Sequence, residues 1–146
     1  MKYLDALIIG AGFSGLYQLH CLRDKLKLNT LVIEEGKDIG GTWYWNTYPG
    51  ARCDSESFTY GFTFSEKIFK NWTWKERYPK QNVILKYLKY FSNELKLKKN
   101  IVFNEKVISA NYIEKNNLWK VQTNNKKKYY TKYLICAVGS LSSINL

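Results

Sequence analysis

The sequence predicts an α/β fold in which a parallel sheet is the central element. Three apolar runs, at residues 3–9, 30–34 and 133–138, are typical of strands buried on both faces of such a sheet. A glycine-rich loop ends the first run, and residues 14–26 then carry leucines at helical spacing. Strand, glycine turn, helix and strand within about 30 residues are the order of a βαβ unit.

The rest of the chain supplies one further helix, a short strand and an antiparallel meander. Residues 36–80 are rich in glycine, proline and aromatic residues without periodicity, so we expect an irregular segment packed on its own side chains. Long segments of this kind are usually functional. An amphipathic helix is predicted over 82–95 and a strand over 101–103. Three strands separated by polar turns are predicted to form an inserted antiparallel β-meander: 107–113, 118–123 and 127–130.

Length and charge limit the classes of function. A chain of 146 residues is long enough for one domain, and such a domain buries roughly 70% of its unfolded surface. The net charge is +11, but 20 of the 23 basic residues are scattered lysines, and no groove-reading motif accompanies them. We therefore attribute the charge to surface composition and expect no nucleic-acid partner.

Cysteine usage and hydropathy indicate a reduced, cytoplasmic protein. Cys21, Cys53 and Cys136 are far apart and have no metal-ligand spacing, so no metal site is expected. Cys21 and Cys136 fall in apolar surroundings and are expected to be buried. No signal-peptide pattern is present, and no apolar run approaches ~20 residues, so no membrane partner is expected either.

The loop Gly10-Ala11-Gly12-Phe13-Ser14-Gly15 matches the GxGxxG fingerprint of dinucleotide-binding proteins. Gly10 permits a tight turn, Gly12 lets the backbone approach a pyrophosphate, and Gly15 lets the helix pack closely on the strand. The helix N-terminus offers free amides to phosphate, and Ser14 is expected either to cap that helix or to donate to a phosphate oxygen.

Glu34 stands at the end of the next apolar run, where an acidic residue accepts hydrogen bonds from the adenosine ribose. A carboxylate there favours a free ribose over a 2′-phosphate, so FAD or NAD fits the site and NADP does not. Glu35, its neighbour, is expected to be a solvated surface residue.

Three further segments carry motifs: the string GGTWYWNTYPGARCD at residues 40–54, Trp72-x-Trp74-x-Glu76-Arg77-Tyr78-Pro79, and Gly139-x-Leu141-Ser142. They resemble the Baeyer–Villiger monooxygenases of the cyclohexanone and phenylacetone type, which are class B flavoprotein monooxygenases. The resemblance runs through essentially the whole chain in order. Thr47 departs from it, since this family commonly carries a basic residue there.

The resemblance implies a Rossmann-like FAD-binding domain and a set of site residues. Asp54 matches the acid that supports, through an arginine, the oxygenated flavin, and it is the implied catalytic residue. The implied cofactor-binding residues are Gly10, Gly12, Ser14, Gly15, Glu34, Gly41, Thr42, Trp43, Trp45, Arg52, Asp54, Tyr60 and Val107.

Other roles are open for several of these positions. Arg52 also fits a surface ion pair, and Tyr60 and Trp45 also fit a core. Trp72 and Trp74 are expected to be packing anchors, and His20 is expected to be a surface or satisfied histidine.

The implied reaction uses NADPH, FAD and O₂ to convert a small-molecule ketone into an ester or lactone. The NADPH domain and the C-terminal FAD segment of the family have no counterpart in this sequence. Residues 1–146 are therefore expected to be an N-terminal segment of the FAD-binding domain, incomplete, inactive alone and in need of the remainder of the enzyme. The alternatives are an N- or S-oxygenating flavin monooxygenase, and a non-catalytic flavin- or nucleotide-binding module that needs a partner chain.

Overall fold

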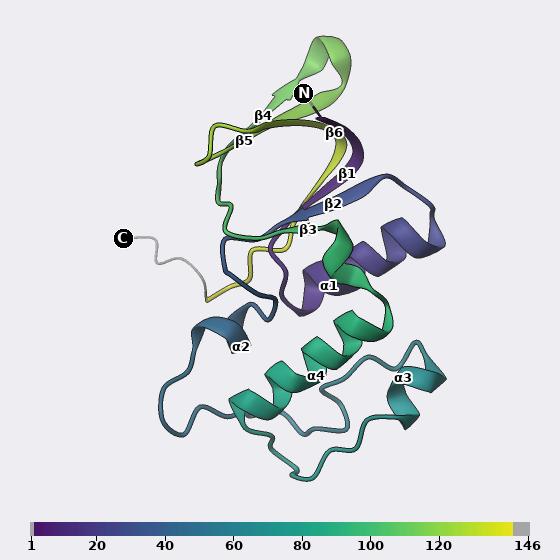
Figure 1. Cartoon of the computed structure of the whole chain (residues 1–146), viewed down its shortest axis with the longest axis vertical. Coiled ribbons are helices and arrows are strands. Elements are labelled where there is room, and N and C mark those ends of the chain that lie inside the picture. Colours follow the sequence, from purple (N-terminus) through teal and green to yellow (C-terminus); the bar gives the residue numbers. More distant parts are fainter. Residues whose placement is uncertain (1, 142–146) are drawn as a thin grey trace.

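A six-stranded sheet with helices packed against it forms the centre of the molecule (Figure 1). The computed structural model describes residues 2–141, with the backbone alone at Lys2; Ser142, part of one family segment above, lies outside this range. The strands lie in the order β3-β2-β1-β6-β5-β4. Four are mutually parallel: β1 (Lys2–Ile9), β2 (Thr30–Ile33), β3 (Ile101–Val102) and β6 (Lys128–Cys136). The predicted parallel sheet of residues 3–9, 30–34 and 133–138 is confirmed, with residues 3–9 lying between the other two.

The strand β6 corrects one boundary of the predicted fold. Residues 127–130 and 133–138 were expected to be two strands, but Lys128–Cys136 is continuous. Its first part pairs antiparallel with β5, and nearly its whole length pairs parallel with β1. Thr131 and Lys132, the polar residues between the two parts, do not break the strand. The buried Thr131 hydroxyl contributes hydrogen bonds to the carbonyls of Asp5 and Tyr133.

The second half of β6 is also less buried than its apolar sequence predicts. Tyr133 is 59% exposed, and Cys136 is exposed rather than buried. The pairing explains this exposure. The ladder with β5 ends at Thr131, so beyond it no strand among residues 2–141 lies along the outer edge of β6.

The predicted meander is confirmed, but it extends the main sheet instead of forming a separate layer. It consists of β4 (Val107–Ile113), a 3₁₀ turn η3 (Glu114–Asn116), β5 (Leu118–Thr123) and β6. A register shift between Val107 and Ser109 marks a β-bulge, which increases strand bending. The sheet curls accordingly (Figure 1), and Val121 and Tyr129 pack with Leu7 and Ile33 in a second apolar cluster.

Two helices cover the other face of the sheet. The helix α1 (Phe13–Leu19) continues as a π-helix, η1 (His20–Lys25), and α4 spans Gln81–Glu94, as predicted within a residue or two. A 3₁₀ turn, η2 (Leu97–Asn100), leads from α4 to β3. The main apolar cluster joins α1 and α4 to β1 and β2 through Leu16, Leu19, Ile84, Leu88, Phe91, Ile8 and Val32. None of the helices described within residues 2–141 has the length and apolar character needed to cross a membrane.

Residues 36–80 are largely irregular, with two short helices, α2 (Thr42–Trp45) and α3 (Glu66–Lys70). Their aromatic side chains pack on α1 and α4 rather than only on one another. Trp72 and Trp74 contact Tyr87 of α4 with ring centroids 5.3 and 5.0 Å apart, which confirms that they are packing anchors.

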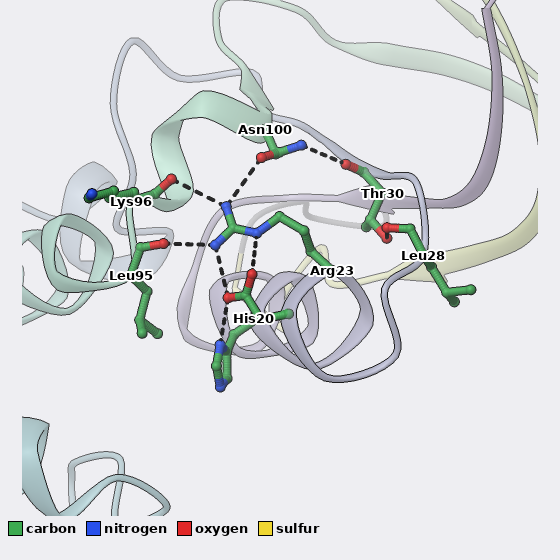
Figure 2. A network of polar contacts seen from close by, with 8 residues as sticks. His20, Arg23, Leu28, Thr30, Leu95, Lys96 and Asn100 are labelled. Atoms are coloured by element: carbon green, nitrogen blue, oxygen red, sulfur yellow. Dashed lines mark hydrogen bonds and ion pairs between the residues drawn. The ribbon is translucent and has the colours of Figure 1, made fainter.

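A polar network around Arg23 connects the helical layer to the sheet (Figure 2). The guanidinium donates to both carboxylate oxygens of Asp24, to the carbonyls of Leu95 and Lys96 at the end of α4, and to Asn100. The Asn100 amide then donates to the carbonyl of Thr30 in β2. His20 contacts Asp24 at 2.8 Å and stacks on Phe64, so it is a satisfied histidine, as expected.

We predict that Arg23→Lys lowers the free energy of unfolding by about 2 kcal/mol at neutral pH, because an ammonium cannot reproduce this set of hydrogen bonds. Hydrogen bonds from Arg23, joined by one from His20, outweigh burial and hold the pKa of Asp24 below its ordinary value. A lowered folded-state pKa contributes stability above the unfolded value, and this contribution disappears as pH falls through the folded value. The loss in Arg23→Lys should therefore shrink in acid, as measured by urea unfolding from neutral pH to about pH 2.

Arg77→Lys is the matched control, since Arg77 is 69% exposed in its ion pair with Glu56. It should change the unfolding free energy by less than about 0.5 kcal/mol. Equal losses in the two variants would contradict the role given to the Arg23 network.

Candidate functional site

The glycine loop lies at the carboxyl end of β1, where the topology of the sheet reverses. The Gly10 amide donates to Ile33 of β2 at 2.8 Å, and Ala137, just after β6, donates to Ile9 at 2.9 Å. The chain proceeds outward from β1 through β2 to β3 and returns on the other side of β1 through β6. Ligands of open α/β sheets bind at this kind of switch point, outside the carboxyl ends of the strands.

Glycine is required at positions 10 and 15 because neighbouring backbone segments lie too close to leave room for a Cβ atom. A Cβ on Gly10, whose φ is +100°, would lie 2.5 Å from the carbonyl oxygen of Ala137. A Cβ on Gly15 would lie 1.9 Å from the carbonyl oxygen of Gly10. These two glycines therefore set the turn and the helix–strand distance, as the fingerprint predicts.

Gly12 differs from these two glycines. Its φ of −81° suits any residue, and a Cβ there would meet only Gly41, at an ordinary contact distance of 3.4 Å. Gly41 has φ +54°, and a Cβ on it would lie 2.9 Å from the Cα of Gly12. The Gly40 amide also donates to Ala11, so the two glycine segments lie backbone against backbone. Nothing within the described chain demands glycine at position 12.

The first turn of α1 presents free amides at this edge. Within residues 2–141, no oxygen accepts a hydrogen bond from the amides of Phe13, Ser14 or Gly15. The residue that begins the helix is Gly12, which has no side chain, so the expectation that Ser14 caps the helix is wrong. The exposed hydroxyl of Ser14 can donate a hydrogen bond to a ligand oxygen. Unpaired amides at a helix start, with the helix dipole behind them, suit a phosphate group.

Glu34 lies immediately beyond β2 and is 5% exposed. One carboxylate oxygen accepts from the amide of Ala11 at 2.6 Å, and the other accepts from the amide of Gly36 at 2.7 Å. The carboxylate thus fixes the glycine loop against the end of β2. Each oxygen has a second lone pair with which it can accept from a ribose hydroxyl. Glu35 is exposed and paired with Lys106, as expected of a surface residue.

Trp43 and Tyr60, both implied cofactor residues, lie against each other. The Trp43 indole donates to the Tyr60 hydroxyl at 3.1 Å, and their rings meet edge to face at 5.9 Å. Burial raises the pKa of Tyr60, as do nearby Cys53 and Asp54, against the hydrogen bond from Trp43. The hydroxyl therefore remains protonated at neutral pH and keeps its own proton available to donate.

The remaining implied residues of the irregular segment lie at the surface. Asp54 is exposed and forms no hydrogen bond or ion pair with any residue in the described range. Arg52 donates to Glu76 at 2.8 Å and to the carbonyl of Tyr78 at 2.6 Å, the surface ion pair that was its alternative role. Trp45 is 55% exposed and contacts Tyr44, so it does not belong to the core. Thr42, also exposed, begins α2 directly after Gly41.

Val107 begins β4 and is half-buried. Its segment lies next to Glu34, because the amide of Glu105 donates to the Glu34 carbonyl at 3.0 Å. One supporting residue was not predicted: the Gln81 side chain donates to the carbonyl of Trp43 and anchors α2 to α4. A glutamine at a helix start carries no pattern that would have identified it.

A cavity of about 520 Å³ lies elsewhere, at the amino end of β1. It is lined by Tyr3, Leu4, Asp5, Asn29, Asn116, Asn117, Leu118 and Lys132. None of the implied site residues lines it, so we assign it no part in the site at the glycine loop.

Comparisons with known proteins agree with the chemistry of this edge. The family described as pyridine nucleotide-disulphide oxidoreductase matches residues 7–146. A Baeyer–Villiger monooxygenase of Pseudooceanicola batsensis is 42% identical over 142 residues, 97% of this chain and 26% of its own length. The cyclohexanone 1,2-monooxygenase of an Acinetobacter species is 40% identical, and a phenazine N-monooxygenase of Lysobacter antibioticus 39%, with the same coverage. The chain thus spans about a quarter of the length of these relatives.

Solved structures give the same result for the fold. Cyclohexanone monooxygenase from Rhodococcus sp. Phi1, bound to NADP⁺, superposes with a TM-score of 0.96 at 41% identity. The match covers 99% of this chain and 27% of that one. A steroid monooxygenase bound to NADP gives a TM-score of 0.95 at 37% identity, covering 99% and 28% of the two chains. The expected resemblance and Rossmann-like fold are confirmed.

The glycine geometry predicts that two alanine substitutions differ in their effect on the stability of the ligand-free chain. Gly15→Ala should lower the free energy of unfolding by about 3 kcal/mol or more, because its methyl group collides with backbone. Gly12→Ala should change that free energy by less than about 1 kcal/mol, because its φ is permitted and its surroundings are open. Urea denaturation of the two variants beside the unsubstituted chain measures both. A large loss in Gly12→Ala would show that the protein itself requires this glycine.

Proposed function

Because the chain belongs to the pyridine nucleotide-disulphide oxidoreductase family, we propose that it is the N-terminal FAD-binding part of a flavin-dependent Baeyer–Villiger monooxygenase. The complete enzyme would use NADPH and O₂ to convert a ketone into an ester or lactone. The names of the relatives and the superposition on cyclohexanone monooxygenase support this reaction class.

One observation carries the nucleotide-binding part of the proposal. The free amides that begin α1 lie beside Gly12, whose lack of a side chain has no cause within the described protein. Both features are at the switch point of the sheet. A pyrophosphate placed there gains hydrogen-bond donors and a favourable helix dipole, and it occupies the space that a Cβ at position 12 would fill.

Glu34 supports FAD as the dinucleotide. Its carboxylate is oriented by the amides of Ala11 and Gly36, and its remaining lone pairs face no donor among residues 2–141. A ribose with free hydroxyls supplies such donors, whereas a 2′-phosphate brings like charge to a carboxylate. Val107, on the segment that borders Glu34, is proposed to meet the adenine through its backbone.

Trp43 and Tyr60 are proposed to form the wall on the flavin side, together with Gly41 and Thr42. Asp54 is exposed and unpaired within the described chain, which leaves it free to accept from an arginine elsewhere in the complete enzyme. Trp45 and Arg52 stay in the proposal as cofactor-binding residues, although Arg52 is engaged by Glu76. When bound, FAD supplies the activation of O₂, and the protein supplies position and electrostatics.

The proposal places most of the NADPH site, and a second segment of the FAD site, in parts of the longer enzyme that this chain does not contain. One dinucleotide fingerprint is present in the sequence, at Gly10–Gly15. The chain covers about a quarter of its relatives, which supports the same division. A cytoplasmic location is proposed from the three free cysteines, which suit a reducing compartment.

A second candidate reaction is N-oxygenation. The phenazine N-monooxygenase matches 97% of this chain at 39% identity, nearly the value for the Baeyer–Villiger enzymes. The overall similarity of this chain to its relatives therefore does not separate the two reactions. Product analysis of the complete enzyme with a cyclic ketone and with an aromatic N-heterocycle distinguishes them.

We predict that the purified chain binds FAD more tightly than NADP, and that Glu34→Gln weakens FAD binding about tenfold through loss of charge-assisted hydrogen bonds. Glu35→Gln is the matched control and should bind FAD like the unsubstituted chain, because Glu35 points to solvent and pairs with Lys106. Gly12→Val should abolish binding. Fluorescence titrations with both nucleotides measure all of these affinities, and tighter binding of NADP would refute the assignment.

The isolated chain should show no ketone-dependent consumption of NADPH above the free-flavin background. Hydride delivery requires a second nucleotide site, and the nearest cation to Asp54 in sequence, Arg52, is already bound to Glu76. Loss of one preorganised charge alone typically costs ~10²–10³ in rate. The assay contains FAD, NADPH and a cyclic ketone, with chromatography for lactone. Turnover above background would mean that these residues, alone or as an oligomer, complete the site.

A further inference from the structure

Glu105 is a carboxylate buried away from the glycine loop, in the connection between β3 and β4. It is 1% exposed. One oxygen accepts from the Tyr129 hydroxyl at 2.8 Å, and the other accepts from the Lys127 ammonium at 2.5 Å. Both partners belong to the turn before β6 and to β6 itself, so the side chain of Glu105 fastens this connection to the meander.

The backbone of the same segment runs along Glu34. The Glu34 amide donates to Val102 at 2.8 Å, and its carbonyl accepts from the Glu105 amide at 3.0 Å. Asn104 donates to Gly36, the residue whose own amide holds the Glu34 carboxylate. Residues 102–105 thus determine the position of the backbone on both sides of Glu34.

The contacts of Glu105 are strong enough to give it this influence. Burial raises its pKa, but the hydrogen bonds from Lys127 and Tyr129 outweigh burial and leave the pKa below its ordinary value. The group is therefore ionised at neutral pH, and burial with hydrogen bonding to Glu105 raises the pKa of Tyr129. Replacing the carboxylate with an amide removes the counter-charge of the Lys127 ammonium and leaves one acceptor oxygen for two donors, which favours local displacement of the segment.

We infer that Glu105 is a positioning residue of the nucleotide site, acting through the backbone of residues 102–105 on the carboxylate of Glu34. This inference rests on the proposed function for its ligand, but the mechanical link between the two glutamates is a property of the ligand-free chain. Val107 lies two residues further along the same connection, where β4 begins and pairs with Thr123 of β5.

The test compares Glu105→Gln with Glu114→Gln, a control on the exposed turn between β4 and β5. Amide hydrogen exchange followed by NMR on the ligand-free chain reports on Ala11 and Gly36, the two donors to Glu34. Glu105→Gln should accelerate exchange at these amides about tenfold relative to the α4 amides of Ile84 and Leu88, and Glu114→Gln should not. Tyr129→Phe removes one hydrogen bond to Glu105 and keeps the ion pair with Lys127, so it should accelerate exchange at the same two amides about threefold. This variant replaces Glu105→Gln in the test if Glu105→Gln does not fold.

FAD titration provides the second measurement. Glu105→Gln should weaken binding about tenfold in the unsubstituted chain and by less than about twofold in a Glu34→Gln background, because two residues acting through one contact are not additive. The inference would be overturned if Glu105→Gln weakened FAD binding equally in both backgrounds. It would also be overturned if exchange at Ala11 and Gly36 were unchanged, or if exchange in α4 were accelerated to the same extent. Absence of FAD binding by the unsubstituted chain would contradict the proposed function, while the exchange data would still decide whether Glu105 positions Glu34.

Discussion

Both oxygens of the Glu34 carboxylate accept hydrogen bonds from backbone amides, one in the glycine loop and one in the turn after β2. A buried carboxylate needs such partners, because an unpaired charge in this position would be strongly destabilising. The protein meets this need with main-chain groups, so Glu34 also fixes the glycine loop against the end of β2. In the proposed nucleotide site, this one contact joins the residue that accepts from the ribose to the loop that holds the phosphates.

Most of the site is built from backbone rather than from side chains. Gly10, Gly15 and Gly41 let main-chain atoms approach one another at distances that a Cβ would forbid, and Gly12 keeps the ligand side open. Charged side chains act mainly behind this surface. Glu105 fixes the backbone beside Glu34, and Arg23 fixes η1 to the end of α4 and to η2. The division suits a site for a dinucleotide, whose pyrophosphate is recognised chiefly by amides.

The sequence predicts the parts of this fold that depend on local pattern. The glycine fingerprint, the acid after the second strand, both long helices and the meander all follow from spacing and periodicity. Patterns of this kind do not reveal which strand edge is covered. Residues 133–138 have the composition of a buried strand, but Tyr133 and Cys136 are exposed because β5 ends opposite Thr131. Glu105 and Gln81 were missed for a related reason, since a polar residue that acts by reaching a distant backbone leaves no local signature.

The position of β6 also determines when the sheet can form. Its first half pairs with β5, its neighbour in sequence, whereas its pairing with β1 joins residues such as Leu4 and Thr131, which are 127 positions apart. Contacts of such separation carry a large loop-closure entropy and slow folding. During synthesis, β1, α1 and β2 must wait for β6 before the centre of the sheet can close. Until then the carboxyl end of β1 lacks its contact with Ala137, so the proposed nucleotide site can be completed only after the meander has left the ribosome.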